Sequence, residues 1–109
     1  MTWTDAGHGT QTAVIGTEHT LLTDTNNATF EGAVDVSNLA NGETVEVRVK
    51  RKILTGGSAI QTFIGSATGG MSPNLSIQIP PTPSPFSISV TLKQLNGTGR
   101  NFDWEVSRV

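Results

Sequence analysis

The sequence predicts an all-β domain, either an antiparallel β-sandwich or a jelly-roll-like small barrel, with about seven to eight short strands. Three observations support this fold class. Apolar and polar residues alternate with a period of two in several stretches, and turn residues recur between these stretches. No window shows apolar residues at the spacing of an amphipathic helix. Thr, Ser, Gly and β-branched residues are abundant, and they are poor helix formers.

Four stretches alternate most clearly, and each predicts a half-buried strand with one face toward water. They run from Val45 to Ile53, from Leu75 to Ile79, from Phe86 to Leu92 and from Phe102 to Val106. In the first stretch, the odd positions through Ile53 are apolar except for Arg51, and the even positions are charged. Because Arg51 interrupts the inward row, we expect a bulge or a strand end near it.

Weaker alternation predicts further strands over residues 13–15, 19–23, 30–36 and 59–66. Turn signals separate the elements, and they are Asn26-Asn27, Asn41-Gly42, Gly56-Gly57, Gly69-Gly70 and Asn96-Gly97. Short strands at this spacing are typical of a sandwich or a small barrel.

Two segments depart from the alternation. Residues 80–85 contain four prolines, which cannot donate to a strand ladder. We therefore expect the preceding strand to stop at Ile79, and a stiff connection to swing the chain to the other sheet. Residues 1–12 are polar and glycine-bearing, with Trp3 as their one large apolar side chain. They predict an extended N-terminal arm outside a single β domain of residues 13–109, with a frayed terminus as the alternative.

The composition narrows the function. The 109 residues carry a net charge of −2 and include no cysteine. The absence of cysteine excludes a disulfide scaffold and a thiolate metal site. We expect no nucleic-acid partner, because the chain lacks a basic excess. We also expect no membrane partner, because we find neither a signal peptide nor an apolar run of spanning length.

Residues for catalysis are few. The chain has two histidines, His8 and His19, and neither a tyrosine nor a G-x-S-x-G nucleophile motif. His8 lies between two glycines, which is a poor setting for a positioned base. The acidic residues around Glu31 form no calcium-binding loop. We therefore expect no enzyme activity, no catalytic or metal-binding residue, no cofactor and no small-molecule substrate.

Candidate partner-binding residues are of three kinds. Trp3 is the first, as the anchor of the arm. The second is a positive strip for an acidic partner, with a solvated strand face that protects a sheet edge as the alternative. The third is the proline segment. The strip consists of Arg48, Lys50, Arg51 and Lys52, and the segment supplies Pro80, Pro81, Pro83 and Pro85. The remaining aromatic residues fall mostly at inward positions, which favours core packing over a sugar-binding platform.

Several stretches resemble small virion proteins of tailed bacteriophages. They are TEHTL at residues 17–21, DVSNLANGETVEVRVK at 35–50, TLKQ at 91–94 and GTGRNFDWEV at 97–106. The resemblance covers most of the chain beyond residue 12 and consists of strand and turn sequences, so it brings no catalytic or ligand residues. It implies a structural part of the virus particle.

The role that fits this resemblance best is a capsid decoration, or cement, protein. Such a protein is synthesised in the host cytoplasm and binds the outer surface of the major capsid protein lattice, where it stabilises the head. The resemblance also implies a symmetric homo-oligomer, with a trimer as the expected form. The alternatives are another virion component from the neck, tail or fibre, a carbohydrate-binding or adhesion module, and a small hydrolase.

Overall fold

The computed structural model describes residues 3–70 and 75–109, which form eight strands and, within these ranges, no helix. The strands are β1 (Thr4–Thr12), β2 (Glu18–Asp24), β3 (Ala28–Asp35), β4 (Thr44–Lys52), β5 (Ala59–Thr68), β6 (Ser76–Ser84), β7 (Ile88–Gln94) and β8 (Asn101–Arg108). The predicted all-β class is confirmed. A membrane-spanning helix is not found in the described ranges.

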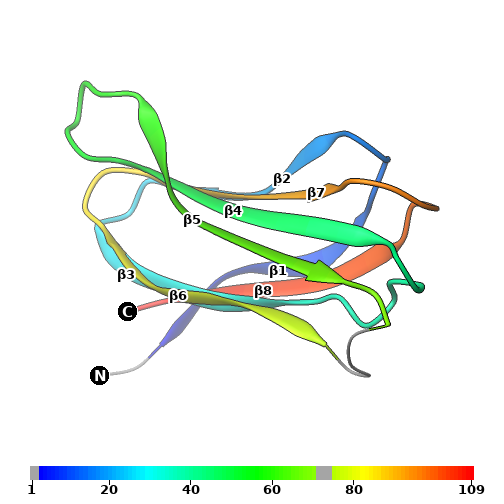
Figure 1. Ribbon diagram of the computed structural model, residues 1–109. Helices are drawn as coiled ribbons and strands as arrows, with labels where there is room; N and C mark the ends of the chain where they lie inside the picture. Colours follow the sequence, from blue (N-terminus) through cyan, green and yellow to red (C-terminus); the bar gives the residue numbers. More distant parts are fainter. Residues whose placement is uncertain (1–2, 71–74) are drawn as a thin grey trace.

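The strands form two four-stranded antiparallel sheets that pack face to face (Figure 1). Sheet A has the order β1-β8-β3-β6, and sheet B has the order β2-β7-β4-β5. The pairing is nested, because β1 pairs with β8, β2 with β7, β3 with β6 and β4 with β5. This is the strand order of an eight-stranded jelly-roll sandwich. Only the β4–β5 connection joins neighbours within one sheet, so it is the one hairpin among the strand connections.

The core fills the space between the two sheets, and it follows the predicted alternation. Val45, Val47 and Val49 of β4 are fully buried, as are Phe30 of β3 and Phe102 of β8. Each of these residues points inward because successive side chains of a strand alternate between its faces. The strand end expected near Arg51 is confirmed, because β4 ends at Lys52. The register shift between Val49 and Lys50 comes from an extra residue in β5, since β4 pairs with β7 without a shift.

Two boundaries were predicted wrongly within the strongest stretches. Ile53 was expected in the inward row, but β4 ends at Lys52 and the Ile53 side chain is 50% exposed. Phe86 was expected to begin a strand, but it precedes β7, which begins at Ile88. In both cases the alternation continues by chance for a position or two beyond the last ladder contact.

The prediction that the strand stops at Ile79 is wrong. β6 continues through Pro80, Pro81 and Pro83 to Ser84, and it remains paired with β3. Prolines are tolerated there because β6 is the edge strand of sheet A, so a missing N–H on the open side costs no hydrogen bond. The predicted crossing between sheets is still made, but it comes after Ser84.

The predicted N-terminal arm is also wrong, because residues 4–12 form β1 and pair with β8 along its length. The glycines in β1 have a structural reason, which is the side chain of Trp104 on the neighbouring strand β8. A Cβ atom at Gly7 would lie 3.2 Å from the indole of Trp104, so this glycine lets the ring pack closely against the strand. Gly9 lies beside the same ring, where a Cβ atom would make an ordinary contact of 3.7 Å. The predicted strand over residues 13–15 is absent, since β1 ends at Thr12.

At the end of the sandwich opposite the β4–β5 hairpin, a buried carboxylate holds two loops together through hydrogen bonds. Glu43 is 6% exposed and precedes β4. Its two oxygens accept hydrogen bonds from Arg100 Nε at 2.9 Å and Nη2 at 3.0 Å. The amides of Thr98 and Ala40 donate to the same carboxylate. Glu43 thus joins the β3–β4 and β7–β8 connections.

We expect the stability of the fold to decrease below about pH 4.5 partly through Glu43. The hydrogen bonds from Arg100, then those from the two amides, lower the pKa of Glu43 from 4.5 to about 2. A lowered folded-state pKa stabilises the fold above the unfolded-state pKa, and this stabilisation is lost as the pH falls toward the folded-state pKa. Urea unfolding of Glu43→Gln should show lower stability at neutral pH and a weaker pH dependence between these values. Equal slopes for the variant and the natural protein would contradict this role.

Candidate functional site

Several predicted partner-binding residues lie at one end of the sandwich, which we call the hairpin end. It contains the β2–β3 connection at 25–27, the β4–β5 hairpin tip at 53–58 and the β6–β7 connection at 85–87. Antiparallel pairing brings these connections together, as Figure 1 shows at its left side. Trp3 precedes β1 at this end, and its side chain is 43% exposed. Pro83 and Pro85 are also exposed there, whereas Pro80 and Pro81 lie farther along β6.

The most apolar part of this end is the apolar hairpin, which we define as Ile53, Leu54 and Ile60. Their side chains are 50%, 69% and 50% exposed. The hairpin projects beyond both sheets and rises on the side of sheet B (Figure 1). It contains two consecutive glycines at its tip. These apolar side chains lie outside the core cluster, so their exposed surface is available to a partner.

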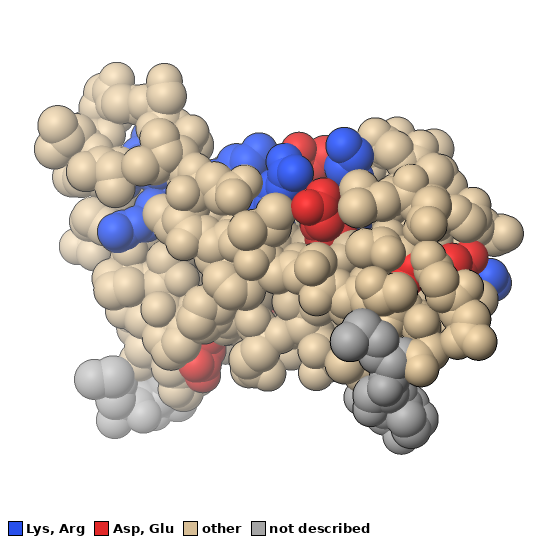
Figure 2. All heavy atoms as spheres, viewed as in Figure 1, with Lys and Arg blue, Asp and Glu red and all other residues tan. Residues whose placement is uncertain are grey.

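The predicted positive strip does not form one surface. Arg48 and Lys50 lie on the outer face of sheet B, and both contact Glu18 of β2. Lys50 Nζ is 2.9 Å from Glu18 Oε2, and Arg48 Nη1 is 3.8 Å from Glu18 Oε1. Arg48 also pairs with Glu46 at 3.4 Å. Figure 2 shows basic and acidic side chains intermingled over this sheet. The face is therefore a mixed network of charges.

Hydrogen bonds hold the acidic centre of this network ionised. Thr91 Oγ1 of β7 donates to Glu18 Oε2 at 2.6 Å. This hydroxyl, followed by Lys50, lowers the pKa of Glu18. The network spans three neighbouring strands of sheet B. The alternative prediction holds in part, because Arg48 and Lys50 lie on a partly solvated strand face. The expected protection of a sheet edge is wrong, because β4 lies between β7 and β5.

Arg51 points the opposite way from Arg48 and Lys50, because it occupies the inward row of β4. Its Nη1 donates to the carbonyl oxygen of Pro83 at 2.6 Å, which connects the ends of the two sheets. Lys52, the last residue of β4, is half-buried beside the hairpin. Of the four basic residues, Arg51 thus contributes to holding the hairpin end together.

The two histidines lie on different sheets. His8 Nδ1 of β1 is 2.7 Å from Asp5 Oδ2, and both side chains are exposed. His19 Nε2 of β2 accepts a hydrogen bond from the amide of Val14 at 3.0 Å, so it stabilises the β1–β2 connection. Over residues 3–70 and 75–109, no group of three or more His, Asp or Glu residues is placed to hold a metal ion.

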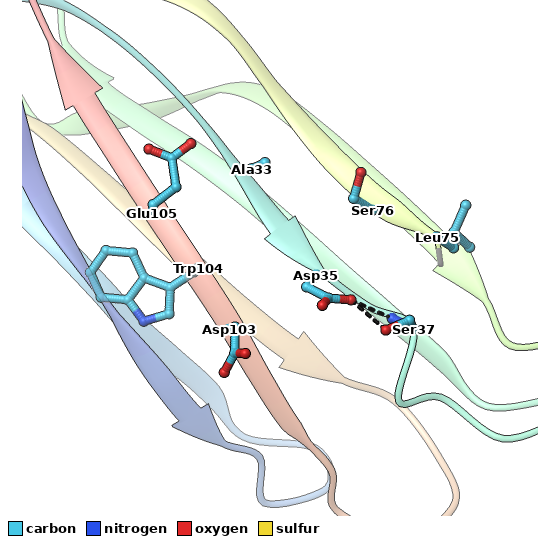
Figure 3. Close-up of a pocket in the computed structure, with 8 residues that line it drawn as sticks. All are labelled: Ala33, Asp35, Ser37, Leu75, Ser76, Asp103, Trp104 and Glu105. Atoms are coloured by element: carbon cyan, nitrogen blue, oxygen red, sulfur yellow. Dashed lines mark hydrogen bonds between the residues drawn. The ribbon is translucent and has the colours of Figure 1, made fainter. Parts of the chain in front are cut away.

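A shallow depression of about 410 Å³ lies on the outer face of sheet A. It is lined by the carboxylates of Asp35, Asp103 and Glu105 and by the residue between the last two, Trp104 (Figure 3). Asp35 accepts hydrogen bonds from the hydroxyl and amide of Ser37, and these lower its pKa. A general acid needs a pKa near the working pH, so this shift makes Asp35 itself a poor proton donor.

The apolar hairpin was not predicted, although the sequence contains a signal for it. Ile53 and Leu54 directly precede a turn with two glycines, and the alternation that includes Ile53 ends there. A pair of large apolar residues next to a turn indicates exposure, because hairpin tips lie outside a sheet.

Comparisons with known proteins show no family. No family model matches the chain, and no curated protein matches it. Among solved structures, it is similar to a chain in the crystal structure of the infectious bursal disease virus VP2 subviral particle. The TM-score is 0.46 with 12% sequence identity, over 98% of this chain and 31% of the viral one. A likeness of this size over under a third of that chain's length carries no argument about function.

Proposed function

We propose that this chain is a virion structural protein, and more specifically a capsid decoration protein that binds the outer surface of the major capsid protein lattice and stabilises the head. The observation that carries the proposal is the apolar hairpin, which projects from a two-sheet scaffold. A decoration protein needs a rigid module and a surface for the shell. The jelly roll is also a fold of viral capsid domains, which is an analogy of fold alone.

The candidate docking surface is the apolar hairpin together with the adjoining outer face of sheet B. Ile53, Leu54 and Ile60 supply the apolar contact. Arg48 and Lys50 lie on the neighbouring face, where their existing ion pairs orient the domain more than they add affinity. Trp3 and Pro83 lie at the same end but beside or in sheet A, so they are separate from this face of sheet B.

The expected affinity of one copy is modest. Burying a fully exposed Ile or Leu side chain stabilises a complex by about 1.5–3 kcal/mol, so three half-exposed ones contribute about 3 kcal/mol together. Association itself costs about 4–15 kcal/mol in lost freedom. A single hairpin therefore binds weakly. Linked copies that contact a repeating lattice bind far more tightly, because each further contact becomes intramolecular.

The chain offers a matched pair of variants for a binding test. Ile53→Ser with Leu54→Ser removes two apolar residues from the hairpin end. Val14→Ser with Ile15→Ser removes two exposed apolar residues from the opposite end, where the natural side chains are 59% and 38% exposed. We expect the hairpin variant to lose about 2 kcal/mol per contact, or about 30-fold in affinity, on virus heads stripped of this protein. The control variant should rebind normally.

The same particles distinguish the proposal from its alternatives. Mass spectrometry of purified virions should give a copy number near that of the major capsid protein. A few dozen copies or fewer would instead indicate a neck, tail or fibre component. Equal rebinding of the two double variants would contradict docking through the hairpin, and absence of the chain from purified virions would contradict a virion role.

A further inference from the structure

A sandwich of two open sheets has four edge strands, and three of these edges carry features that discourage pairing with another chain. β6 contains Pro80, Pro81 and Pro83, which cannot donate to a neighbouring strand. β1 carries Asp5, and β2 carries Glu18. Both β1 and β2 also shift register along their length. Charges, prolines and bulges of this kind are the usual protection of an open edge.

The fourth edge, β5, lacks charged residues and prolines. It has ten residues, Ala59–Thr68, which makes it the longest strand. Within the described part of the chain, its ladder partner is β4 alone, so no strand forms a ladder with its other side, although β5 also contacts β6 of the opposite sheet. The bulge near its start leaves residues 63–68 in unbroken register with β4. Ile64 lies in this regular part, on the outer face opposite Arg48, and is 45% exposed.

We infer that β5 pairs in an antiparallel arrangement with β5 of a second copy of this chain, about a two-fold axis centred on Ile64. The lack of charged residues in β5 favours a second copy of this chain as the partner of its open edge. A two-fold interface places each residue of the strand near its own counterpart, so a charged strand would repel itself, whereas β5 does not. The two Ile64 side chains would cover each other on the outer face.

The size of this contact is sufficient for a specific interface. A regular antiparallel pair of ten-residue strands forms about ten hydrogen bonds, and the bulge near the start of β5 removes some of them in each copy. The remaining number still lies within the range of about 10 ± 5 found in a typical protein–protein interface. The pairing would extend sheet B of one copy into sheet B of the other. The inferred pairing does not depend on the proposed function, because it uses only the β5 edge of the isolated domain.

The arrangement has a consequence for the apolar hairpin. The two-fold axis of an antiparallel strand pair is perpendicular to the sheet, so both outer faces of sheet B lie on the same side of the dimer. Each hairpin rises on that side (Figure 1). Because the strands run in opposite directions, the two hairpins lie at opposite ends of the extended sheet. A dimer would therefore present two apolar contacts in one direction, as bivalent binding to a surface requires.

The test uses the purified full chain without virus particles. Native mass spectrometry and light scattering over a dilution series should show a dimer. Ile64→Glu should raise its dissociation constant at least about tenfold, because two carboxylates then face each other. The same substitution is compatible with the monomer, since the new carboxylate lies opposite Arg48. Ile15→Glu, which alters an exposed apolar residue away from β5, should leave the dimer intact, and both variants should keep the thermal transition.

A cysteine experiment tests the register even where Ile64→Glu lowers stability. The chain has no cysteine, so Ile64→Cys introduces a single thiol. Oxidation should crosslink this variant into a covalent dimer, whereas Ile15→Cys should stay monomeric under the same conditions. A monomeric or trimeric natural protein, or equal crosslinking of the two variants, would overturn the inference. The inference would also be overturned if the β5 amides gained hydrogen-exchange protection only on capsids, because β5 would then pair with a strand of the capsid protein.

Discussion

Gly32→Ala is expected to destabilise the domain by about 3 kcal/mol, a large part of the roughly 5–15 kcal/mol that holds a small domain folded. Gly32 is buried in β3, in register with Val106 of β8. A Cβ atom at this position would overlap the backbone carbonyl oxygen of Glu105. Since the obstacle is backbone in a central strand pair, no side chain can move aside, and β3 must separate from β8. Urea unfolding monitored by circular dichroism measures the loss.

The matched control is Gly56→Ala, in the tip of the β4–β5 hairpin. No heavy atom lies within 4 Å of a Cβ atom built there, and the backbone is not in the left-handed region. We expect a change within about 0.5 kcal/mol, as for an ordinary surface substitution. Similar losses for the two variants would mean that the effect at Gly32 comes from the general properties of glycine and not from the contact with β8.

Phe102→Ala is expected to destabilise the domain by about 3–5 kcal/mol. Phe102 is fully buried, on a strand that lies between β1 and β3 in sheet A. Its ring belongs to the one hydrophobic cluster that both sheets share. Removing the ring leaves a cavity, and neither sheet can fill it without disturbing its own strand pairing. The loss in stability therefore exceeds the free energy of transferring the ring from water to the core. Thermal and urea unfolding measure it.

Two comparisons check the origin of this loss. Phe102→Leu keeps most of the volume and should cost clearly less than the alanine variant. Trp3→Ala removes a larger ring that is 43% exposed, and it should cost clearly less than Phe102→Ala because much of the Trp3 side chain already contacts water. A Trp3 variant as unstable as Phe102→Ala would contradict the placement of Trp3 outside the core.

The alternation of apolar residues predicted the strands well where both sheet neighbours were present. β4 and β7 lie inside sheet B, and their inward rows match the predicted ones from Val45 to Val49 and from Ile88 to Leu92. Alternation indicates which residues face the core, so it predicts the inward residues reliably for strands that have a neighbour on each side. It does not report which strand pairs with which, and the nested order could therefore not be derived from it.

Edge strands account for the main failures. β1 was taken as an arm and β6 was ended too early, because glycines and prolines normally interrupt a strand. An edge strand forms hydrogen bonds on one side only, so it tolerates both residues. Trp104 shows the same limitation, since nothing in the local sequence indicates that Gly7 leaves room for its ring.

The candidate site was predicted only in part, for a related reason. The four basic residues are close in sequence, but neighbours along a strand point to opposite faces, so Arg51 supports the hairpin end while Arg48 and Lys50 join a network with Glu18. The carboxylate at the centre of that network is Glu18 of β2, which is distant in sequence. Charge patterns read along the chain do not include such partners.

The nested strand order also governs when the domain can fold during its synthesis. β8 is made after the other seven strands, yet it lies inside sheet A and is the ladder partner of β1. Until residues 101–108 have left the ribosome, β1 lacks its ladder partner, and β3 lacks one of its two neighbours. The nascent chain can form the β4–β5 hairpin early, but closure of the sandwich must wait for β8. Such long-range closure is intrinsically slow, because distant segments must meet before their contacts stabilise anything.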